Sequence, residues 1–431
     1  MSETTETAAQ VKGHLLGDDH LALTVVHHPD ASFVGAYQAL PKGEYAVGRE
    51  SSTLFPGLFD HKRVSRAHAT LRAAGGTLSV HDLGSRNGTY VNGERVERGE
   101  LSPGDSLRIG PVVLVVHRGP RHYDEPASEV LAGASYVMSQ LVDALEEAGR
   151  SEQPVMLIGE TGVGKELAAK LVHEASGRSG PLVPVNCGAL ADGVMASELF
   201  GHVRGAFSGA DIERRGLVDE AQGGTLFLDE IGSASPALQS ALLRLLENRE
   251  YRVVGDSALR IADVRFVAAT HPGVRTTVQE GGFRSDLWYR LAHQVVDLPP
   301  LRAHREDIPA IVERRFGAGA PQLSPELVDA MMRHPWPGNV RELIATVDRW
   351  TGDPERVRDL SDWKVASRPE PMAPAPKTKR PSRDELLDAF RRRRASVSAV
   401  AKAFGVSRKS VYRWVETLEI DLSELRDGQE T

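Results

Sequence analysis

The sequence predicts a multidomain chain in which an all-β sandwich comes first, an α/β domain second and a small all-α module last. Residues 14–118 contain short apolar runs separated by glycine-rich turns, and residues 130–363 alternate apolar strands with longer helical stretches. A basic segment lies near the end of the chain. The 431 residues are enough for about three domains of ordinary size, so we expect the three segments to fold as separate units.

The first segment has the pattern of half-buried strands joined by tight turns. Leu78 and Val80 alternate with polar residues, which is the two-residue period of a strand with one buried face. Asn87-Gly88 and Asn92-Gly93 are dipeptides that form tight turns because both residue types tolerate a positive φ. We expect an all-β sandwich over residues 20–120.

The middle segment is typical of a parallel sheet covered by helices. The short apolar runs are PVMLIG, GTLFLDE and DVRFVAAT, and they alternate with segments of helical spacing such as GKELAAKLVHEA and PALQSALLRLLENREY. We expect an α/β domain over residues 130–365. Residues 366–382 are rich in proline, alanine and lysine, which predicts a linker.

A small basic module follows the linker. Residues 377–413 contain 12 Lys and Arg against 3 Asp and Glu, although the whole chain carries a net charge of −7. Residues 383–421 have the spacing of three helices, with a turn at Gly405 and a capping serine, Ser407, before the last helix. This pattern predicts a helix-turn-helix that binds double-stranded DNA, with a solvated basic helix pair as the alternative. The residues expected to contact bases or phosphates are Arg408, Lys409, Ser410, Tyr412 and Arg413.

The composition excludes several classes of protein. The chain has one cysteine, Cys187, so an internal disulfide and a zinc site made of several cysteines are excluded. No uncharged apolar run reaches the roughly 18 residues of a membrane span, and the polar N-terminus does not resemble a secretory signal. We expect a cytoplasmic protein with no membrane partner.

A glycine-rich loop after the first strand of the middle domain carries the clearest chemistry. The sequence GETGVGK has the spacing GxxxxGK. Glycines let backbone N–H groups approach phosphate oxygens, the following helix adds its dipole, and Lys165 can reach the terminal phosphates. Glu166 stands where a hydroxyl residue would often contact Mg²⁺. The residues expected to bind nucleotide here are Gly159, Glu160, Thr161, Gly162, Val163, Gly164, Lys165 and Glu166.

An acidic pair ends a later strand of the same domain. Asp229 and Glu230 follow the run TLFL. Asp229 is placed to hold Mg²⁺, directly or through water, and Glu230 is placed to polarise the attacking water. Many strands end in a solvated carboxylate, so this pair is informative mainly because it follows the phosphate loop in the expected order. The two motifs together predict an ATPase that uses ATP and Mg²⁺.

Seven motifs in one order carry a specific resemblance. They are GETGVGKE, NCGAL (186–190), SELFGHVRGAFSGA (197–210), GGTLFLDE, FRSDLWYRL (283–291), LPPLRAHREDIP (298–309) and WPGNVREL (336–343). Together they resemble the AAA+ domain of bacterial enhancer-binding proteins, the activators of sigma-54 RNA polymerase. The resemblance covers about residues 131–343 and implies a P-loop α/β domain with a helical lid.

The resemblance implies a sigma-54 contact and a sensor position. The GAFSGA loop would grip sigma-54, and its residues are Gly205, Ala206, Phe207, Ser208, Gly209 and Ala210. Phe207 suits a mobile apolar probe, although a buried phenylalanine would be the ordinary interpretation of such a loop alone. Thr270 lies near the family's sensor position, and His271 follows it where the family usually has asparagine.

Further catalytic residues are implied in the same way. Asn186 matches the switch residue that holds the catalytic glutamate until ATP binds, and Arg341 matches the sensor arginine of the lid. Arg284 and Arg290 match two arginines that reach into the neighbouring subunit's ATP site, where a guanidinium can neutralise charge on the transferred phosphoryl group. ATP sites shared between subunits imply a homo-oligomeric ring, typically a hexamer.

The first segment carries a second resemblance. Gly48-Arg49, SRAH (65–68) and DLGSRNGTYVNG (82–93) occur in the order found in forkhead-associated (FHA) domains, which bind phosphothreonine peptides from loops at one end of a sandwich. The resemblance implies that Arg49 and Ser65 would hold the phosphate, with further charge from Arg66 or Lys62. Asn87 would hold the peptide backbone and His68 would brace the loop. A sandwich that no longer binds phosphothreonine is the alternative.

The three segments together predict a transcriptional activator. The C-terminal module resembles the Fis-type helix-turn-helix usual in this activator family. We therefore expect a protein that binds upstream DNA and uses ATP hydrolysis to remodel sigma-54 RNA polymerase. A phosphothreonine protein or a Ser/Thr kinase would supply the input. Two alternatives stay open: a phosphopeptide-guided protein-remodelling ATPase without a promoter role, and a DNA-binding adaptor with a degraded ATPase.

Overall fold

The computed structural model describes residues 20–120, 130–133, 135–189 and 192–352, together with the helical positions Arg383, Leu386, Ala389 and Phe390. The chain divides into two compact units, Met1–Val365 and Ala366–Thr431, and nearly all described residues belong to the first. The positions expected to contact DNA, Arg408, Lys409, Ser410, Tyr412 and Arg413, lie outside the described residues.

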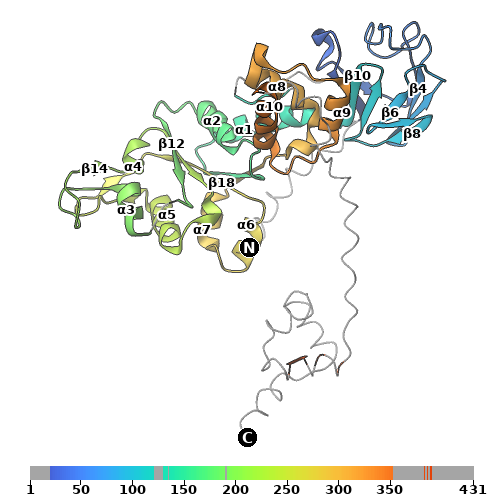
Figure 1. Cartoon of the computed structure of the whole chain (residues 1–431). Coiled ribbons are helices and arrows are strands. Elements are labelled where there is room, and N and C mark those ends of the chain that lie inside the picture. The colour runs from blue at the N-terminus through green and yellow to red at the C-terminus, as the bar shows by residue number, and fades with distance from the viewer. Residues whose placement is uncertain are drawn as a thin grey trace. The chain divides into compact units, whose positions relative to one another are not determined.

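The first domain consists of two antiparallel sheets, which confirms the predicted β-sandwich (Figure 1). One sheet has the strand order β2-β1-β10-β9-β6-β7 and the other has the order β3-β4-β5-β8. The strands are β1 (His20–His27), β2 (Tyr37–Leu40), β3 (Gly43–Val47), β4 (Ala69–Ala74), β5 (Thr77–Asp82), β6 (Thr89–Val91), β7 (Glu94–Val96), β8 (Arg98–Leu101), β9 (Ser106–Ile109) and β10 (Val112–Gly119). A 3₁₀ turn, η1 (Ala31–Phe33), follows β1.

The two-residue period of the sequence places side chains in the core of the sandwich. Leu78 and Val80 are buried on β5, and they pack in one cluster with residues of the facing sheet such as Leu23 and Leu107. The polar residues between them lie on the outer face, as successive strand residues must. Gly88 has a φ of 80°, which agrees with the tight turn expected at the Asn-Gly dipeptide.

The second domain is built on a five-stranded parallel sheet in the order β12-β15-β18-β11-β19. Its strands are β11 (Val155–Ile158), β12 (Leu182–Asn186), β15 (Thr225–Asp229), β18 (Arg265–Thr270) and β19 (Gln294–Asp297). Its helices are α1 (Tyr136–Arg150), α2 (Lys165–Ala175), α3 (Asp192–Phe200), α4 (Leu217–Glu220), α5 (Pro236–Asn248), α6 (Val274–Gln279) and α7 (Ser285–Leu291), with a 3₁₀ turn η2 (Ile231–Ser233). Two short ribbons are formed by β13 (Gly201–His202) with β14 (Arg214–Arg215) and by β16 (Glu250–Tyr251) with β17 (Arg260–Ile261).

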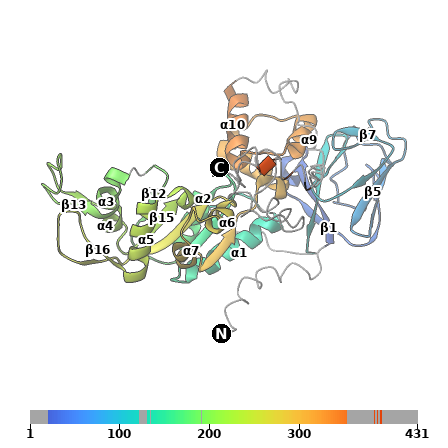
Figure 2. The same cartoon turned by 90° about the horizontal axis from the view of Figure 1, so that it is seen from below.

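Helices cover both faces of this sheet (Figure 2). Leu226 and Leu228 of β15 pack in a cluster with α3, α5 and α7, whereas Phe227 between them packs with α1 and α2. Neighbouring side chains of a strand point to opposite faces, so one strand belongs to both clusters. This explains why the central strands appear in the sequence as unbroken apolar runs, and it confirms the α/β prediction.

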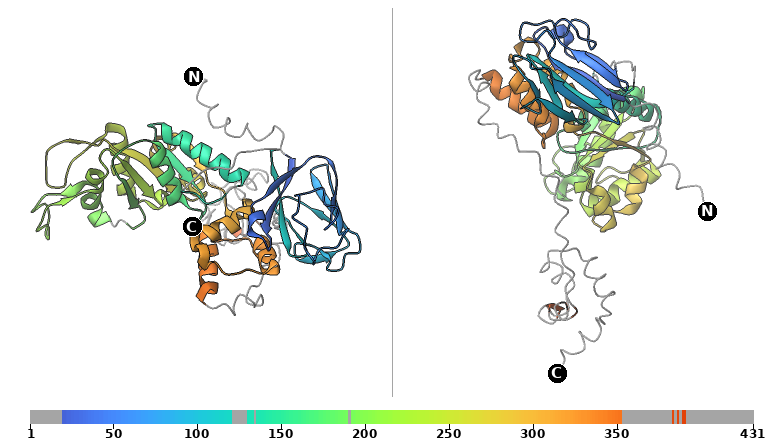
Figure 3. Two further views of the ribbon diagram at one scale, coloured as in Figure 1. Left: turned by 90° about the horizontal axis from the view of Figure 1, so that it is seen from above. Right: turned by 90° about the vertical axis from the view of Figure 1, so that its right-hand side faces the viewer.

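The helical lid follows β19 and is drawn in orange in Figure 3. It consists of α8 (Ile308–Phe316), α9 (Pro325–Arg333) and α10 (Asn339–Gly352), with the 3₁₀ turns η3 (Leu301–Ala303), η4 (Arg305–Asp307) and η5 (Gly317–Gly319). The side chain of Ser324 caps α9 by accepting from the N–H of Leu327, and Pro325 occupies the first turn, where its missing N–H costs nothing. In the lid core, Trp336 Nε1 donates to the carbonyl oxygen of Met331 at 3.0 Å. None of the helices described here is long and apolar enough to cross a membrane.

Candidate functional site

Four strands of the parallel sheet end at the same edge, and each leads to a residue that the sequence marked. The loop before Lys165 follows β11, Asn186 ends β12, Asp229 ends β15 and Thr270 ends β18. Asn186 lies opposite Asp229 in the strand register. Ligands of open α/β sheets bind at the carboxyl ends of the strands, so this edge is the candidate site.

The loop between β11 and α2 is shaped by glycine and held by its own lysine. Gly162 has a φ of 80°, and a Cβ at this position would collide with the carbonyl oxygen of Gly338 in the lid. Lys165 begins α2, and its Nζ donates to the carbonyl oxygens of Gly159 and Glu160 at 2.9 and 3.0 Å. The lysine therefore lies folded against the loop whose N–H groups are suited to phosphate.

The acidic pair lies near this lysine. Burial lowers the pKa of the Lys165 ammonium, while the charges of Asp229 and Glu230 act on it in the opposite direction. Glu230 donates its backbone N–H to Asp229 Oδ1 at 2.9 Å and has a φ of 51°, a value that few non-glycine residues adopt. The Glu230 side chain is exposed to water. Asp229 Oδ2 accepts no hydrogen bond from a described residue, so it is free to meet a cation.

Asn186 is turned toward its own loop. Its Oδ1 accepts hydrogen bonds from the N–H groups of Gly188 and Ala189 at 3.0 and 3.1 Å. It makes no hydrogen bond with Glu230 among the described contacts. The structure therefore places Asn186 at the edge of the sheet where Asp229 ends its strand, with its amide oxygen bonded within its own loop.

Thr270, near the expected sensor position at the end of β18, has a hydroxyl with no partner among the residues that the structure describes. Thr270 is buried, and its Oγ1 has no hydrogen-bond partner within the described part of the chain. A Cβ at Gly232 would approach this oxygen to 2.8 Å, so little room is left around it. His271 is exposed, and its Nδ1 accepts from the N–H of Gly273 at 3.0 Å. His271, which stands where we expected an asparagine, thus forms a hydrogen bond within its own turn.

The lid contacts the phosphate loop through a residue to which the sequence analysis gave no role. Arg302 donates two hydrogen bonds to the carboxylate of Glu160, at 2.8 and 2.6 Å. These bonds hold the pKa of the Glu160 carboxyl down at about 2. The signal was present, since Arg302 lies inside the motif LPPLRAHREDIP, but only the folded lid shows what it contacts.

A second tie joins the start of α10 to the same loop. Asn339 Nδ2 donates to the carbonyl oxygen of Thr161 at 3.0 Å, and the N–H of Arg341 donates to the carbonyl oxygen of Gly162 at 3.3 Å. The structure therefore brings the expected lid arginine to the phosphate loop. Asn339 is a further site residue that the motif WPGNVREL contained and that sequence reasoning missed.

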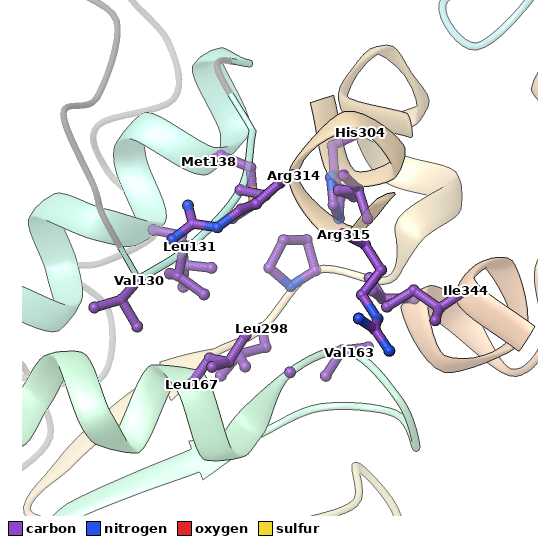
Figure 4. A pocket seen from close by; sticks show the side chains of 16 residues that line it. Val130, Leu131, Met138, Val163, Leu167, Leu298, His304, Arg314, Arg315 and Ile344 are labelled. Atoms are coloured by element: carbon purple, nitrogen blue, oxygen red, sulfur yellow. The ribbon is translucent and has the colours of Figure 1, made fainter. Parts of the chain in front are cut away.

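An apolar cavity of about 280 Å³ lies beside the phosphate loop, where the α/β domain meets the lid (Figure 4). Its lining consists of Val130, Leu131, Ala132, Met138, Leu141, Val163, Gly164, Leu167, Leu298, Pro299, His304, Ile311, Arg314, Arg315, Val340 and Ile344. A small apolar cavity next to a phosphate-binding loop suits the flat ring of a nucleotide base. The sequence pattern did not predict this cavity, because its walls come from separate elements.

Arg284 and Arg290 lie on the surface at α7 and do not contact the phosphate loop of their own chain. Arg284 pairs with Asp286 at 2.7 Å, and Arg290 lies 3.5 Å from a carboxylate oxygen of Glu247. Neither arginine forms a contact with the acidic pair in the described structure. Both guanidinium groups are more than two-fifths exposed and are therefore accessible from outside the subunit.

The segment between β13 and β14 forms a closed loop with an aromatic side chain on it. The N–H of Gly205 donates to the carbonyl oxygen of Ala210 at 2.8 Å, and the N–H of Ala210 donates to that of Phe207 at 3.1 Å. Phe207 is 46% exposed, with its ring 5.0 Å from the ring of His202. Ser208 is exposed beside it. The loop thus offers half of an aromatic ring to solvent.

Three loops meet at one end of the β-sandwich. The N–H of Arg49 donates to the carbonyl oxygen of Ser65 at 3.0 Å, and the N–H of Arg86 donates to Ser65 Oγ at 3.1 Å. Asn87 Nδ2 donates to the carbonyl oxygen of Arg63 at 2.6 Å. The structure therefore brings together the residues that the FHA resemblance marked.

This end of the sandwich is cationic. Its exposed cations are Arg49, Lys62, Arg63, Arg66 and Arg86. None of them forms an ion pair with a described residue. A group of cations without carboxylate partners favours the binding of an anion.

A buried histidine and a glycine hold these loops together. His68 Nδ1 accepts from the N–H of Ser65 at 3.1 Å, and its Nε2 lies 3.3 Å from the carbonyl oxygen of Gly88. Burial lowers the pKa of His68, so the neutral ring is favoured and bridges the two loops. A Cβ at Gly48 would collide with the carbonyl oxygen of Arg66, so the chains approach here as only glycine allows.

Comparison with known proteins decides the family. Residues 131–297 match the sigma-54 interaction domain, residues 45–110 match the FHA domain and residues 302–352 match the AAA+ ATPase lid domain. The transcriptional regulatory protein ZraR of Klebsiella oxytoca is 38% identical over 308 residues, which cover 67% of this chain and 69% of ZraR. The chain belongs to the family of sigma-54-dependent transcriptional regulators.

Other regulators of this family share the central domain. The nitric oxide reductase transcription regulator NorR1 of Cupriavidus necator is 44% identical over 227 residues, which cover 51% of this chain and 44% of NorR1. Among solved structures, NtrX from Brucella abortus is 28% identical with a TM-score of 0.50, over 68% of this chain and 69% of NtrX. This sigma-54-dependent regulator is accordingly an AAA+ ATPase that carries an FHA domain in front of its ATPase domain.

Proposed function

We propose that this regulator binds DNA upstream of sigma-54 promoters and uses ATP hydrolysis to remodel sigma-54 RNA polymerase, under the control of phosphothreonine recognition by its FHA domain. One observation supports the proposal above all others. The same α/β domain carries a nucleotide site at the carboxyl edge of its sheet and a half-exposed Phe207 on the closed loop of residues 203–210.

In this proposal ATP lies across the phosphate loop and the apolar cavity. The base enters the cavity, and Lys165 leaves its loop carbonyls for the terminal phosphates. Asp229 has a free carboxylate oxygen with which to hold Mg²⁺, and the ion would neutralise charge on the phosphate oxygens. Glu230, exposed to water at the end of β15, would polarise the attacking water. Arg341 would approach the phosphates from the lid.

Arg284 and Arg290 would complete the ATP site of a neighbouring subunit in a ring, which we expect to be a hexamer. Their present carboxylate partners lie on the surface and are two-fifths or more exposed, and surface ion pairs of this kind contribute little to stability. The arginines can therefore exchange them for phosphate at low cost. Asn186 would act as the switch residue, and this role requires its amide to turn from its own loop toward Glu230.

The Phe207 loop would contact sigma-54 and move with the nucleotide state. The Ser208 hydroxyl takes the place of the family's threonine. The C-terminal residues 383–421, rich in Lys and Arg, would bind DNA as a Fis-type helix-turn-helix. Arg49, Ser65, Arg66 and Asn87 would hold a phosphothreonine peptide, since they meet at a cationic end of the sandwich without internal carboxylate partners.

The proposal is tested with Lys165→Ala in the full chain, with Lys170→Ala on the same helix as the matched control. The first variant should bind promoter DNA but neither hydrolyse ATP nor activate transcription from a sigma-54 promoter. The control should do all three. Activation by Lys165→Ala would contradict the proposed mechanism.

A pull-down separates the proposal from its main alternative. Sigma-54 is captured by the wild-type ring in the presence of ADP and aluminium fluoride, which imitates the transferred phosphoryl group. Retention of sigma-54 supports the activator. Normal ATP hydrolysis with no retention in any nucleotide state would indicate a remodelling ATPase that acts on another protein, guided by phosphopeptides.

A further inference from the structure

Two neighbouring strands of the FHA sandwich are buried on both faces. In β10 the six residues from Val112 to His117 are all buried, and in β1 the six residues from Leu21 to Val26 are buried. The strands β4 and β5 of the other sheet show the usual alternation of buried and less buried positions. An antiparallel sheet normally keeps one face wet, so the outer face of β1 and β10 must be covered.

The lid of the same chain covers this face. Val26, Val113 and Val115 lie outside the sandwich core and belong instead to the cluster of the lid. The lid members of that cluster are Leu301, Ile308, Ile311, Val312, Val328, Met331, Met332, Trp336, Leu343 and Val347. Helix α9 contacts β1, β9 and β10. The sandwich and the lid therefore share one hydrophobic cluster.

Several polar groups pair across the same contact, although the buried Nε atoms of Arg108 and Arg305 have no hydrogen-bond partner within the described residues. Asp329 of α9 is 2% exposed, and the Ser106 hydroxyl of β9 donates to its carboxyl group. Arg108 of β9 approaches the second carboxyl oxygen of Asp329 to 4.0 Å. His27 Nε2 of β1 lies 3.1 Å from the carbonyl oxygen of Leu323 in the lid. Buried polar groups that find partners across a contact are a mark of a built interface.

The 3₁₀ turn η4, which leads directly into α8 of the lid, contacts the sandwich on one side. Arg305 NH1 donates to the carbonyl oxygen of Gly104 at 2.9 Å. The next residue, Glu306, is 8% exposed, and its Oε1 lies 3.9 Å from Nδ1 of His117 on β10. Two consecutive residues of the turn therefore rest on the FHA domain.

The same turn touches the wall of the nucleotide cavity on its other side. Asp307 accepts hydrogen bonds from the N–H and the hydroxyl of Ser135 at 2.8 and 2.6 Å, and Ser135 caps α1 through Met138. His304 Nδ1 lies 3.0 Å from Asp307 Oδ2. Met138 and His304 both line the cavity beside the phosphate loop. Three successive residues thus join the sandwich to the cavity wall.

We infer that the FHA sandwich is docked on the lid of its own chain and positions the walls of the nucleotide cavity through the turn Arg305–Asp307. The lid thus covers the outer face of β1 and β10. The FHA domain then contributes to the shape of the nucleotide cavity. This inference does not depend on phosphopeptide binding.

Docking leaves the loops at the end of the sandwich open. Arg49, Arg66 and Asn87 are exposed, and the shared cluster contains no residue of their loops. A ligand held by these loops would therefore stay attached to the lid without undocking the sandwich. In this arrangement a ligand bound by the FHA loops is connected to the ATPase lid through the docked sandwich.

The inference is tested with Val113→Asp in the full chain, which places a charge in the shared cluster and not in the sandwich core. The matched control is Arg72→Asp, on an exposed position of β4 in the other sheet. We measure the affinity for a fluorescent ADP, and hydrogen exchange at the amides of η4 and α9. Val113→Asp should weaken ADP affinity by roughly 5- to 150-fold, the usual range of coupling between sites, and speed exchange at both elements. The control should leave both unchanged.

Unchanged ADP affinity and unchanged hydrogen exchange in Val113→Asp would overturn the inference.

Thermal unfolding without nucleotide shows whether this variant keeps a folded sandwich. If it does not, Glu326→Lys serves in its place, because Glu326 is 49% exposed and accepts from Arg108 NH1 at 3.2 Å across the contact. Asp348→Lys on α10 makes the same charge change at another exposed position of the lid. If Glu326→Lys weakens ADP binding and Asp348→Lys does not, docking is supported. If the two variants bind ADP equally well, docking is refuted.

Discussion

Arg302 in the lid holds Glu160 in the phosphate loop with two hydrogen bonds, at 2.8 and 2.6 Å. Asn339 Nδ2 donates to the same carboxylate at 3.2 Å. A planar guanidinium that makes two hydrogen bonds to one carboxylate fixes the orientation of the pair and also contributes electrostatic attraction. The position of the lid is therefore coupled directly to the GxxxxGK loop, which we propose binds the phosphates of ATP.

Arg302→Ala should loosen this coupling and weaken nucleotide binding. The two side chains are 43% and 34% exposed, so the pair is worth about 0.5–1 kcal/mol, and we expect ADP affinity to fall about two- to fivefold. The measurement is an ADP titration at low and high salt, since added salt should shrink the difference. Arg150→Ala, which breaks an exposed pair with Glu146 on α1, is the control and should not change affinity. Equal affinities in all three proteins would show that the pair does not act on the site.

Glu230→Gln should separate nucleotide binding from hydrolysis. The amide keeps the size of the side chain but cannot polarise water as a carboxylate does, so we expect ATPase activity to fall on the order of 10²–10⁴-fold with ATP affinity nearly unchanged. Phosphate release and ATP titration measure the two quantities. Glu220→Gln, at an exposed carboxylate of α4, is the control. Hydrolysis at the normal rate would remove Glu230 from the catalytic role.

Phe207→Ala should abolish sigma-54 binding and leave ATP hydrolysis intact, because the ring is exposed and lies outside the nucleotide site. Ile212→Ala is the control, since Ile212 is 73% exposed just beyond the closed loop. Sigma-54 retention is measured with ADP and aluminium fluoride, and ATPase activity in parallel. Loss of retention in both variants would mean that general exposed apolar area, and not the aromatic ring, makes the contact.

Glu306→Gln should flatten the dependence of stability on pH. Burial and the charge of Asp307 raise the pKa of Glu306 to about 8, against an ordinary value of about 4.5, and Arg305 opposes the shift. The folded state therefore holds the proton more tightly than the unfolded state, and this stabilisation is fully present below pH 4.5. It is lost as the pH rises toward 8, with a slope of at most about 1.4 kcal/mol per pH unit.

Urea unfolding of wild type and Glu306→Gln at pH 5, 6.5 and 8 measures this slope. The facing residue is His117, and burial lowers its pKa, which disfavours a charged imidazole beside Glu306. The variant should lose less stability than wild type between pH 5 and pH 8. Parallel curves for the two proteins would show that Glu306 does not keep its proton in the fold.

Gly48→Ala should impair the end of the FHA domain that we propose binds phosphothreonine. The added methyl group would collide with the carbonyl oxygen of Arg66, so the two loops must separate, at a cost of about 1–3 kcal/mol. We expect lower affinity for a phosphothreonine peptide in a titration of the full chain. Gly43→Ala is the control, because a Cβ there meets its neighbours at 3.7 Å or more. Equal peptide affinity in both variants would refute this assignment of Gly48.

Local sequence pattern was enough for the elements and for most of the candidate site. The GxxxxGK loop, the strand that ends in Asp229 and the turn at Asn87-Gly88 depend on residues that are neighbours in the chain. The parallel order of the strands then brings Lys165 and Asp229 to one edge. Asn186 ends β12 at the same edge, but its hydrogen bonds to Gly188 and Ala189 could not be predicted from spacing.

The sequence by itself determined which residues form strands, helices and turns, and which motifs could bind phosphate, because burial period, capping and glycine turns act within a few residues. Only the tertiary structure decided which of these surfaces meet. The unbroken apolar run of β10 is visible in the sequence, but the sequence does not show that the lid covers its outer face. The pairing of Arg302 with Glu160, the cavity walls and the contact of Ser106 with Asp329 join residues far apart in the chain. Such contacts are set by how whole elements pack, and the free energy of that packing is shared among many residues and encoded in no single stretch.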